Sequence, residues 1–293
     1  MSLFNTPVLI IAWRRPKHLI NVINALRTVA PNYVFVAVDG PRVGVEYDEE
    51  RKLIAKTKKV IESEIDWNCD LKTMYREENY GCARGVSSAI TWFFSYCEEG
   101  IILEDDIVIT RAGLLFLEQG LRKYRGMSDI WMVSAWKPFK TFGLPIIQDY
   151  FYCWGWATWK RAWINYSLEI PNFNLRYSRL GFINEHWSSI FMKVRDIDTW
   201  DYQMQYWMFV YKAKAVLPPR NYVDNIGFDL LAHHTKGVKP DKFKIRENPG
   251  LLDSLTITIP KVISDILDYK LVRNDKWTIQ RLKRKIRLKL KNF

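Results

Sequence analysis

The sequence predicts an α/β fold in which a mostly parallel sheet is flanked by helices, and three observations support this. Over the first 136 residues, short apolar segments alternate with segments whose apolar residues recur at helical spacing. The helical segments run to about 10–15 residues, which favours parallel strands joined by right-handed crossovers. The chain has 293 residues and is 48% hydrophobic and 26% charged, which is typical of a folded protein with a sizeable core.

The elements follow one another along the chain in a regular order. Pro16 opens the first helix, at a position where the missing N–H of proline does no harm. We expect strands at 8–13, 33–38, 71–75, 101–103 and 130–135, and helices from Pro16 onward and at 48–64, 83–97 and 114–124. From about 137 to 235 the sequence is aromatic and irregular. Residues 236–293 are expected to form a C-terminal extension with an amphipathic segment at 262–271 and a basic amphipathic tail.

The charge is unevenly distributed. The net charge of the chain is +12, but eight basic residues and no acidic residue lie in 276–293, so the remainder carries only +4. This argues against nucleic acid as a partner of the main body, because a fold that follows phosphates is basic throughout. As a helix, the tail would carry Leu282, Ile286 and Leu290 on one stripe among cations, which favours binding to an anionic membrane surface. A solvated basic tail and a strand are the alternatives.

Cysteine usage and hydropathy indicate the compartment. The four cysteines form no CxxC pair and no framework typical of disulfides, which indicates a reducing environment. No apolar run approaches the roughly 18 residues that a membrane-spanning helix needs. The apolar run at 8–13 is interpreted as a strand rather than a signal peptide, because it lacks a preceding basic segment. We therefore expect a cytoplasmic protein that lies peripherally on the inner face of the membrane.

Polar residues follow the expected strands at the edge where ligands bind in such sheets. Arg14, Asp39 and the triplet Glu104-Asp105-Asp106 stand at three strand ends. Three adjacent carboxylates at the end of a buried strand are costly unless a cation binds them. An Mg²⁺ or Mn²⁺ ion that holds a diphosphate would satisfy them, although an acidic helix start is the alternative. Neither GxGxxG nor GxxxxGK[ST] occurs, which argues against dinucleotide-binding dehydrogenases and P-loop enzymes.

Several short motifs, taken in order, resemble one enzyme class. The sequence between residues 7 and 235 is similar to nucleotide-diphosphosugar glycosyltransferases of the GT-A (Rossmann-like) type. The acidic triplet resembles that of the N-acetylglucosaminyltransferase I family, and the later motifs resemble bacterial polysaccharide glycosyltransferases. The motifs are Arg14-Arg15-Pro16, Asp39-Gly40, 79–85 (NYGCARG), Glu104-Asp105-Asp106, 155–159 (GWATW), 200–203 (WDYQ), 225–228 (NIGF) and His234-Thr235.

The resemblance implies roles for the acidic triplet and for a late histidine. Asp106 would be the direct ligand of Mn²⁺ or Mg²⁺, and Glu104 and Asp105 would face the donor sugar and the ribose. His234 would complete the metal shell. A histidine near a core is more often simply hydrogen-bonded, and the sequence does not decide whether His233 or His234 would bind the metal.

The resemblance also implies which residues bind the nucleotide and its diphosphate. Asp39 would hydrogen-bond the base, and Arg14 would meet the nucleotide at the end of the first strand. Arg84 would meet the diphosphate together with the N-terminus of its helix, which favours anions. The alternatives are that Asp39 belongs to a simple turn and that Arg84 is a surface cation.

Asp201 is the candidate general base. An inverting sugar transfer needs one carboxylate to take the proton of the attacking acceptor hydroxyl. Alternatively, Asp198 caps a helix and Asp201 offsets the helix dipole in its first turn. Trp156, Trp159 and Trp200 are the candidates for stacking on the acceptor sugar, and a packed aromatic core is the competing interpretation.

The sequence therefore predicts a metal-dependent, inverting glycosyltransferase that uses a nucleoside-diphosphate sugar, with a UDP-sugar favoured, and a glycan or lipid-linked acceptor. Residues 1–235 would form the catalytic domain, with a nucleotide-sugar-binding half at 1–110 and an acceptor-side half at 111–235. A sugar nucleotidylyltransferase and a non-catalytic membrane- or nucleic-acid-binding module are the alternatives. Nucleotidylyltransferases usually open with a glycine-rich loop, whereas this first strand ends Ala12-Trp13-Arg14-Arg15.

Overall fold

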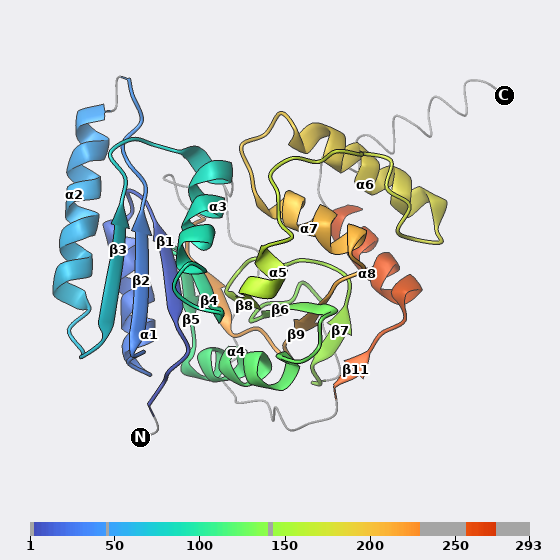
Figure 1. Ribbon diagram of the computed structural model, residues 1–293, viewed down its shortest axis with the longest axis horizontal. Coiled ribbons are helices and arrows are strands. Elements are labelled where there is room, and N and C mark those ends of the chain that lie inside the picture. Colours follow the sequence, from blue (N-terminus) through green and yellow to red (C-terminus); the bar gives the residue numbers. More distant parts are fainter. Residues whose placement is uncertain (1–2, 45–46, 140–142, 229–255, 274–293) are drawn as a thin grey trace.

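The computed structural model describes residues 3–44, 47–139, 143–228 and 256–273 (Figure 1). The strands are β1 (Val8–Ala12), β2 (Tyr33–Val38), β3 (Asp70–Tyr75), β4 (Glu99–Glu104), β5 (Ile107–Ile109), β6 (Ile130–Ser134), β7 (Ile146–Gln148), β8 (Trp156–Trp159), β9 (Lys214–Leu217), β10 (Val223–Asn225) and β11 (Ile257–Thr258). The helices are α1 (Pro16–Arg27), α2 (Tyr47–Glu64), α3 (Gly81–Phe93), α4 (Arg111–Tyr124), α5 (Lys160–Trp163), α6 (Gly181–Val194), α7 (Asp201–Val210) and α8 (Lys261–Arg273).

The first half alternates strands and helices as the sequence predicts. Helix α1 begins at Pro16 and buries one apolar stripe that includes Leu19 and Leu26. Helix α4 begins behind Thr110, whose hydroxyl accepts a hydrogen bond from the Gly113 amide at 3.1 Å. Strands β1, β2 and β4 are apolar almost throughout, because helices cover both faces of the sheet.

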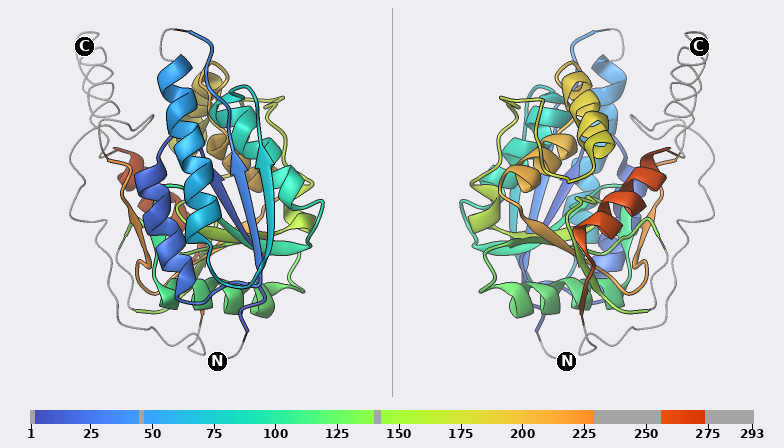
Figure 2. Two further views of the ribbon diagram at one scale, coloured as in Figure 1. Left: turned by 90° about the vertical axis from the view of Figure 1, so that its left-hand side faces the viewer. Right: turned by 90° about the vertical axis from the view of Figure 1, so that its right-hand side faces the viewer.

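Within the described residues, one mixed sheet of nine strands has the order β11-β7-β9-β6-β8-β4-β1-β2-β3. Strands β1 to β4 are mutually parallel, and β8 lies antiparallel between β4 and β6. Helices α1, α2 and α4 pack on one face of the sheet, and α3, α5 and α7 pack on the other. The two side views show the strands between α1 and α3 (Figure 2). The carboxyl ends of β1, β2 and β4 consequently meet at one edge.

The aromatic region holds regular elements that the sequence analysis did not predict. Strands β7, β8 and β9 complete the sheet, and α6 and α7 pack together over a third apolar cluster that includes Trp187, Phe191 and Phe209. A separate two-stranded sheet pairs β5 with β10 and aligns Asn225 with Ile107. That pairing brings the segment after Asn225 against the acidic triplet.

The described part of the C-terminal extension packs against the body of the protein. Strand β11 pairs in parallel with β7, and Tyr269 of α8 packs against the cluster beneath α6 and α7. A boundary at residue 235 therefore does not separate residues 256–273 from the preceding fold. The tail at 274–293, His233 and His234 lie outside the described residues. In the described part of the chain, no helix is both long enough and apolar enough to cross a membrane.

Candidate active site

Arg15 joins the ends of the two central strands. Strand β1 runs parallel to β4, so that Ile11 aligns with Glu104 and the residues after each strand emerge side by side. Arg15 stands just before α1 and forms ion pairs with both Asp105 and Asp106, the latter at 2.7 Å. The Trp13 amide donates a second hydrogen bond to Asp105 at 3.1 Å. The end of β1 thus supplies a cation and a backbone donor to the acids that follow β4.

Burial explains why this pairing matters. Asp105 is 1% exposed and Asp106 is 7% exposed, and buried carboxylates are strongly unfavourable without partners. Burial raises the pKa of Asp106, and the charge of Arg15 opposes that shift. Burial alone would lower the pKa of Arg15, but its two acidic partners raise it above the ordinary value. A cation for these two acids is therefore present as the Arg15 side chain, whereas the sequence analysis expected a metal ion here and placed Arg14 at the nucleotide.

The segment after β10 closes the far side of the acids. The Ile226 amide donates to the Asp106 carbonyl at 2.9 Å, and the Asn225 side chain accepts from the Gly227 amide at 2.8 Å. A Cβ on Gly227 would collide with the Asp106 carboxylate, so the close approach requires glycine. The NIGF motif therefore lies against the acidic triplet, as expected of residues that belong to one site.

Glu104 faces the opposite side of β4. In the part of the chain that the structure describes, its carboxyl group has no hydrogen-bond partner. Burial, followed by the negative charge of Asp106, raises the pKa of Glu104 to about 8, and the charge of Asp201 adds to the shift. Asp201 is thus close enough to Glu104 for the two carboxyl groups to influence each other. A raised carboxyl pKa is a common property of catalytic sites.

Asp201 begins helix α7. Its carboxylate accepts hydrogen bonds from the Thr199 hydroxyl at 2.5 Å and from the Tyr202 amide at 3.0 Å. The expected cap is different, because Trp200 rather than Asp198 is the residue before α7, so Asp201 is the first helical residue and not the third. The short hydrogen bond from Thr199 fixes one carboxylate oxygen of Asp201, which is what a positioned proton acceptor requires.

Asp198 instead caps α3, the helix expected to bind the diphosphate. Its two carboxylate oxygens accept from the Cys82 and Ala83 amides at 2.7 Å each. Arg84 lies with its guanidinium 4.1 Å from the centre of the Tyr80 ring. The N-terminal amides that would have received a phosphate are therefore bound to a carboxylate in this structure, which corrects that part of the expected donor site.

The two other predicted nucleotide-binding residues lie in separate ion pairs. Arg14 forms an ion pair at 2.8 Å with Glu50, a fully buried residue of α2. This ion pair joins Arg14 to α2 rather than to the acidic triplet. The Asp39 carboxylate accepts from the Tyr80 amide at 3.0 Å and lies 3.5 Å from Arg76. Burial raises the pKa of Asp39 despite these partners. Asp39 remains at the end of β2, beside the other strand ends.

The three predicted acceptor-binding tryptophans belong to the core. Trp156, Trp159 and Trp200 are 1%, 2% and 3% exposed, respectively. The Trp156 and Trp200 rings stack on each other, with centroids 5.8 Å apart. Because their faces are covered by protein, they do not offer a surface to a sugar, and the competing interpretation as an aromatic core is correct.

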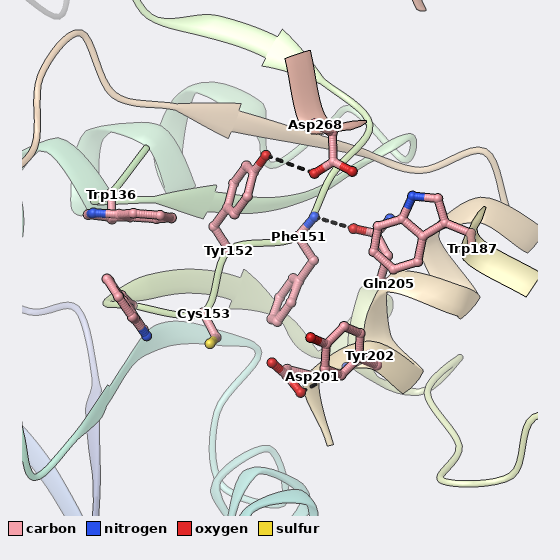
Figure 3. A pocket seen from close by; sticks show the side chains of 10 residues that line it. Trp136, Phe151, Tyr152, Cys153, Trp187, Asp201, Tyr202, Gln205 and Asp268 are labelled. Carbon is pink, nitrogen blue, oxygen red and sulfur yellow. Dashed lines mark hydrogen bonds between the residues drawn. The ribbon is translucent and has the colours of Figure 1, made fainter. Parts of the chain in front are cut away.

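Other aromatic residues line a pocket beside Asp201 (Figure 3). The pocket has a volume of about 180 Å³. Its lining comes from the segment after β6, the segment before β8, α6, α7 and α8: Trp136, Phe151, Tyr152, Cys153, Trp154, Trp187, Asp201, Tyr202, Gln205 and Asp268. The sequence analysis missed Asp268. The sequence carries no local signal for it, because the burial of Asp265 and Asp268 follows from the packing of α8 on elements distant in the chain.

The acidic triplet offers few ligands to a metal ion. Among the described residues, no group of three or more His, Cys, Asp or Glu side chains could hold one. Asp105 uses both carboxylate oxygens, whereas Asp106 uses one, and Glu104 is not hydrogen-bonded within the described ranges. The residues fit an Mg²⁺ or Mn²⁺ ion that takes one or two carboxylates and receives its other ligands from phosphate and water.

Comparison with known proteins gives similarity to solved structures alone, since no protein-family model and no curated protein matches the chain. 4-Diphosphocytidyl-2C-methyl-D-erythritol synthase from Anaerococcus prevotii has 9% identity and a TM-score of 0.38 over 72% of this chain and 88% of its own. HddC from Yersinia pseudotuberculosis has 13% identity and a TM-score of 0.30 over 49% and 60%. UTP-bound UGPase from Acinetobacter baumannii has 8% identity and a TM-score of 0.32 over 73% and 86%. Similarity at this level does not assign a reaction.

Proposed function

We propose that the protein is a glycosyltransferase that moves a sugar from a nucleoside-diphosphate sugar, preferably a UDP-sugar, to a glycan or lipid-linked acceptor. The observation that carries the proposal is the pair of buried acids at the end of β4, Asp105 and Asp106, which the end of β1 holds through Arg15. Strand-end acids suit the donor, and a second carboxylate beside an aromatic pocket suits the acceptor. Arg15 forms an ion pair with each of these two buried acids.

The triplet and Arg15 would form the donor side. Asp106 would hold a divalent ion through its remaining carboxylate oxygen, with the donor diphosphate as the other main ligand, and the ion would neutralise charge on the leaving group. Glu104 and Asp105 would face the sugar and the ribose, and Asp39 would face the base. Arg84 stays a proposal as a diphosphate contact, at the start of α3.

Asp201 would act on the acceptor side as the general base of an inverting transfer. Thr199 holds one of its oxygens at 2.5 Å and so orients the carboxylate. The acceptor hydroxyl would donate its proton to Asp201 while its oxygen attacks the anomeric carbon and the nucleoside diphosphate leaves. The basic tail would bring the enzyme to a membrane that carries the acceptor.

A sugar nucleotidylyltransferase is the second candidate, because it would need the same sheet and strand-end acids. The segment after β1 argues against it. Trp13 fills this segment, donates its indole N–H to the Gly40 carbonyl at 2.9 Å and lies beneath Arg14 at 4.4 Å. A large side chain packed here leaves no glycine-rich loop that could wrap a triphosphate.

The deciding experiment incubates the purified protein with a panel of nucleoside-diphosphate sugars and MnCl₂ and identifies the products. We expect a free nucleoside diphosphate, and release of pyrophosphate from a nucleoside triphosphate and a sugar phosphate would support the second candidate instead. Asp106→Asn should reduce donor hydrolysis at least 100-fold, and Asp201→Asn should reduce transfer by about 10²–10⁴-fold.

A surface variant provides the control for these substitutions. Asp129 pairs with Lys214 at the protein surface, 2.7 Å apart, so Asp129→Asn makes the same chemical change outside the site. Its turnover should equal that of the wild type. Unreduced donor hydrolysis in folded Asp106→Asn, with the fold checked by circular dichroism, would refute the proposed role of the triplet.

A further inference from the structure

The pocket beside Asp201 is too small to enclose a whole nucleotide sugar. Its volume of about 180 Å³ is smaller than the roughly 300–1,000 Å³ of sites that enclose a drug-sized molecule. Trp136, Trp154 and Trp187 are among its walls, so aromatic rings come from three different segments. Trp136 and Trp187 are buried, so Trp154, which is half-buried, is the indole of these three that can cover the C–H face of a pyranose, and carboxylates can bind its hydroxyl groups. These walls suit one sugar ring and not a whole nucleotide sugar.

Asp268 supplies an unused acceptor to this pocket. The residue lies on α8, lines the pocket and is 4% exposed. The Tyr152 hydroxyl donates to its Oδ1 at 3.4 Å, whereas Oδ2 is buried and forms no hydrogen bond of ordinary length among the described residues, although the Trp187 indole lies close enough to the carboxyl group to lower its pKa. A buried carboxylate oxygen without a donor is costly. A ligand hydroxyl that enters the pocket would satisfy it.

Asp268 and Asp201 lie at opposite ends of the same pocket. In Figure 3, Asp268 is above Tyr152 at the top of the view and Asp201 is below Phe151 at the bottom. A ring held between them would present one hydroxyl group to each carboxyl group. We infer that this pocket is a subsite for a single neutral pyranose ring of the acceptor, and that Asp268 binds a hydroxyl group of this ring other than the one that reacts.

This inference rests on the proposed glycosyltransferase function, and it extends that function to the acceptor. The hydroxyl at Asp201 is the nucleophile, and the hydroxyl at Asp268 decides which acceptor ring binds and in which orientation. A site built to bind a hydroxyl rejects the analogue that lacks it, because the carboxylate is then left unpaired. Asp268 is accordingly a specificity residue supplied by the C-terminal extension.

Ligand binding tests this without any turnover. Saturation-transfer-difference NMR would measure the affinities of methyl glycosides of glucose, galactose, mannose and N-acetylglucosamine, and of the monodeoxy forms of the best ligand. We expect one deoxy form to bind wild type at least tenfold more weakly than its parent. In Asp268→Leu, which keeps the volume and removes the acceptor, parent and deoxy form should bind within twofold of each other. If the leucine variant does not fold, Asp268→Asn replaces it in the experiment. In Asp268→Asn the ratio between the affinities of the parent glycoside and its deoxy form should also fall, but by less.

The controls separate the possible failures. Asp129→Asn should bind the glycosides as wild type does. Absence of binding by every glycoside, or equal discrimination in wild type and in both Asp268 variants, would overturn the inference. Binding of methyl glucosaminide more than tenfold more tightly than methyl glucoside would also overturn it, because the pocket would then select a cation. Donor hydrolysis by wild type, measured separately with MnCl₂, tells whether the proposed function fails as well.

Discussion

The buried acids at the strand ends and the buried acid in the aromatic pocket differ in their charge partners. At the strand ends, Asp105 and Asp106 share the guanidinium of Arg15, so opposite charge offsets their burial. In the aromatic pocket, Asp268 forms no ion pair with any residue that the structure describes. Burial there raises the pKa of Asp268 to about 7, and the nearby Asp265 adds to the shift.

The difference indicates what each region can do. The Arg15 cluster places two carboxylates and a guanidinium together at the strand ends, which suits the binding of a cation and a diphosphate. The pKa of Asp268 lies near neutral pH. Below it the protonated carboxyl group can donate a hydrogen bond to a ligand in the pocket, and above it the carboxylate is a stronger acceptor. Three measurements can break or sharpen this contrast.

Removal of the positive charge of Arg15 should have the largest effect on stability. Arg15→Met leaves Asp105 and Asp106 buried without their charge partner and should lower the free energy of unfolding by about 3–5 kcal/mol. Urea unfolding measures this. Arg125→Met is the control, since Arg125 pairs with Glu99 at the surface and should cost about 0.2–1 kcal/mol. Equal losses in the two variants would mean that the strand-end acids do not depend on Arg15.

The acid in the pocket should give a pH-dependent stability instead. Its pKa of about 7 in the folded protein lies above the ordinary 3.8, so between these values the folded chain keeps a proton that the unfolded chain has lost. Stability from this group is therefore complete below pH 4 and is lost as pH rises through 7, by up to about 4 kcal/mol.

Comparison with Asp268→Asn isolates that contribution. The free energy of unfolding of this variant, minus that of the wild type, should increase between pH 4.5 and pH 7.5. The comparison cancels His186, whose burial lowers its pKa to about 4 and which acts in the opposite direction. Parallel pH profiles for the two proteins would show that Asp268 is not a buried, proton-holding acid.

A third acid is held by backbone amides and should have the smallest effect. Asp198→Ala removes two hydrogen bonds from the first turn of α3 and should lower the free energy of unfolding by about 0.5–2 kcal/mol. Thermal unfolding measures the change. Asp196→Ala is a nearby control, because the Asp196 side chain forms an exposed ion pair with Arg195 at 3.7 Å and no other hydrogen bond or ion pair with the residues that the structure describes. No difference between these variants would remove Asp198 as the cap of α3.

The fold of the first half could be predicted because its signals are local. Pro16 begins α1, and apolar periodicity places β1, β2, β4 and β6 to within one or two residues. Strand β8 gave no such signal. Its four residues are all buried, so they do not alternate, and its Thr158 hydroxyl donates to the Trp131 carbonyl at 2.6 Å from inside the core. Pairing with β4 and β6 determines this strand, and such long-range pairing is not visible in local sequence.

The candidate site was predictable at the strand ends and not beyond them. Parallel topology brings Asp39 and the acidic triplet to one edge, whichever residues lie between them. Local sequence cannot tell which of Arg14 and Arg15 turns toward the acids, because this depends on contacts with distant elements: Arg14 pairs with Glu50 of α2, and Arg15 pairs with Asp105 after β4. The roles of Asp198 and Asp268 depend on contacts between elements distant in the chain, with α3 and with the aromatic pocket respectively.

The late arrival of β8 in the chain has a consequence for synthesis on the ribosome. Residues 156–159 fill the middle of the sheet, but they emerge after β1 to β7. Until then, β4 has β1 on one side and an open row of backbone donors and acceptors on the other, a template for pairing with another chain. A chain in which β8 has not yet joined the sheet therefore exposes an edge of β4 that can pair with another chain.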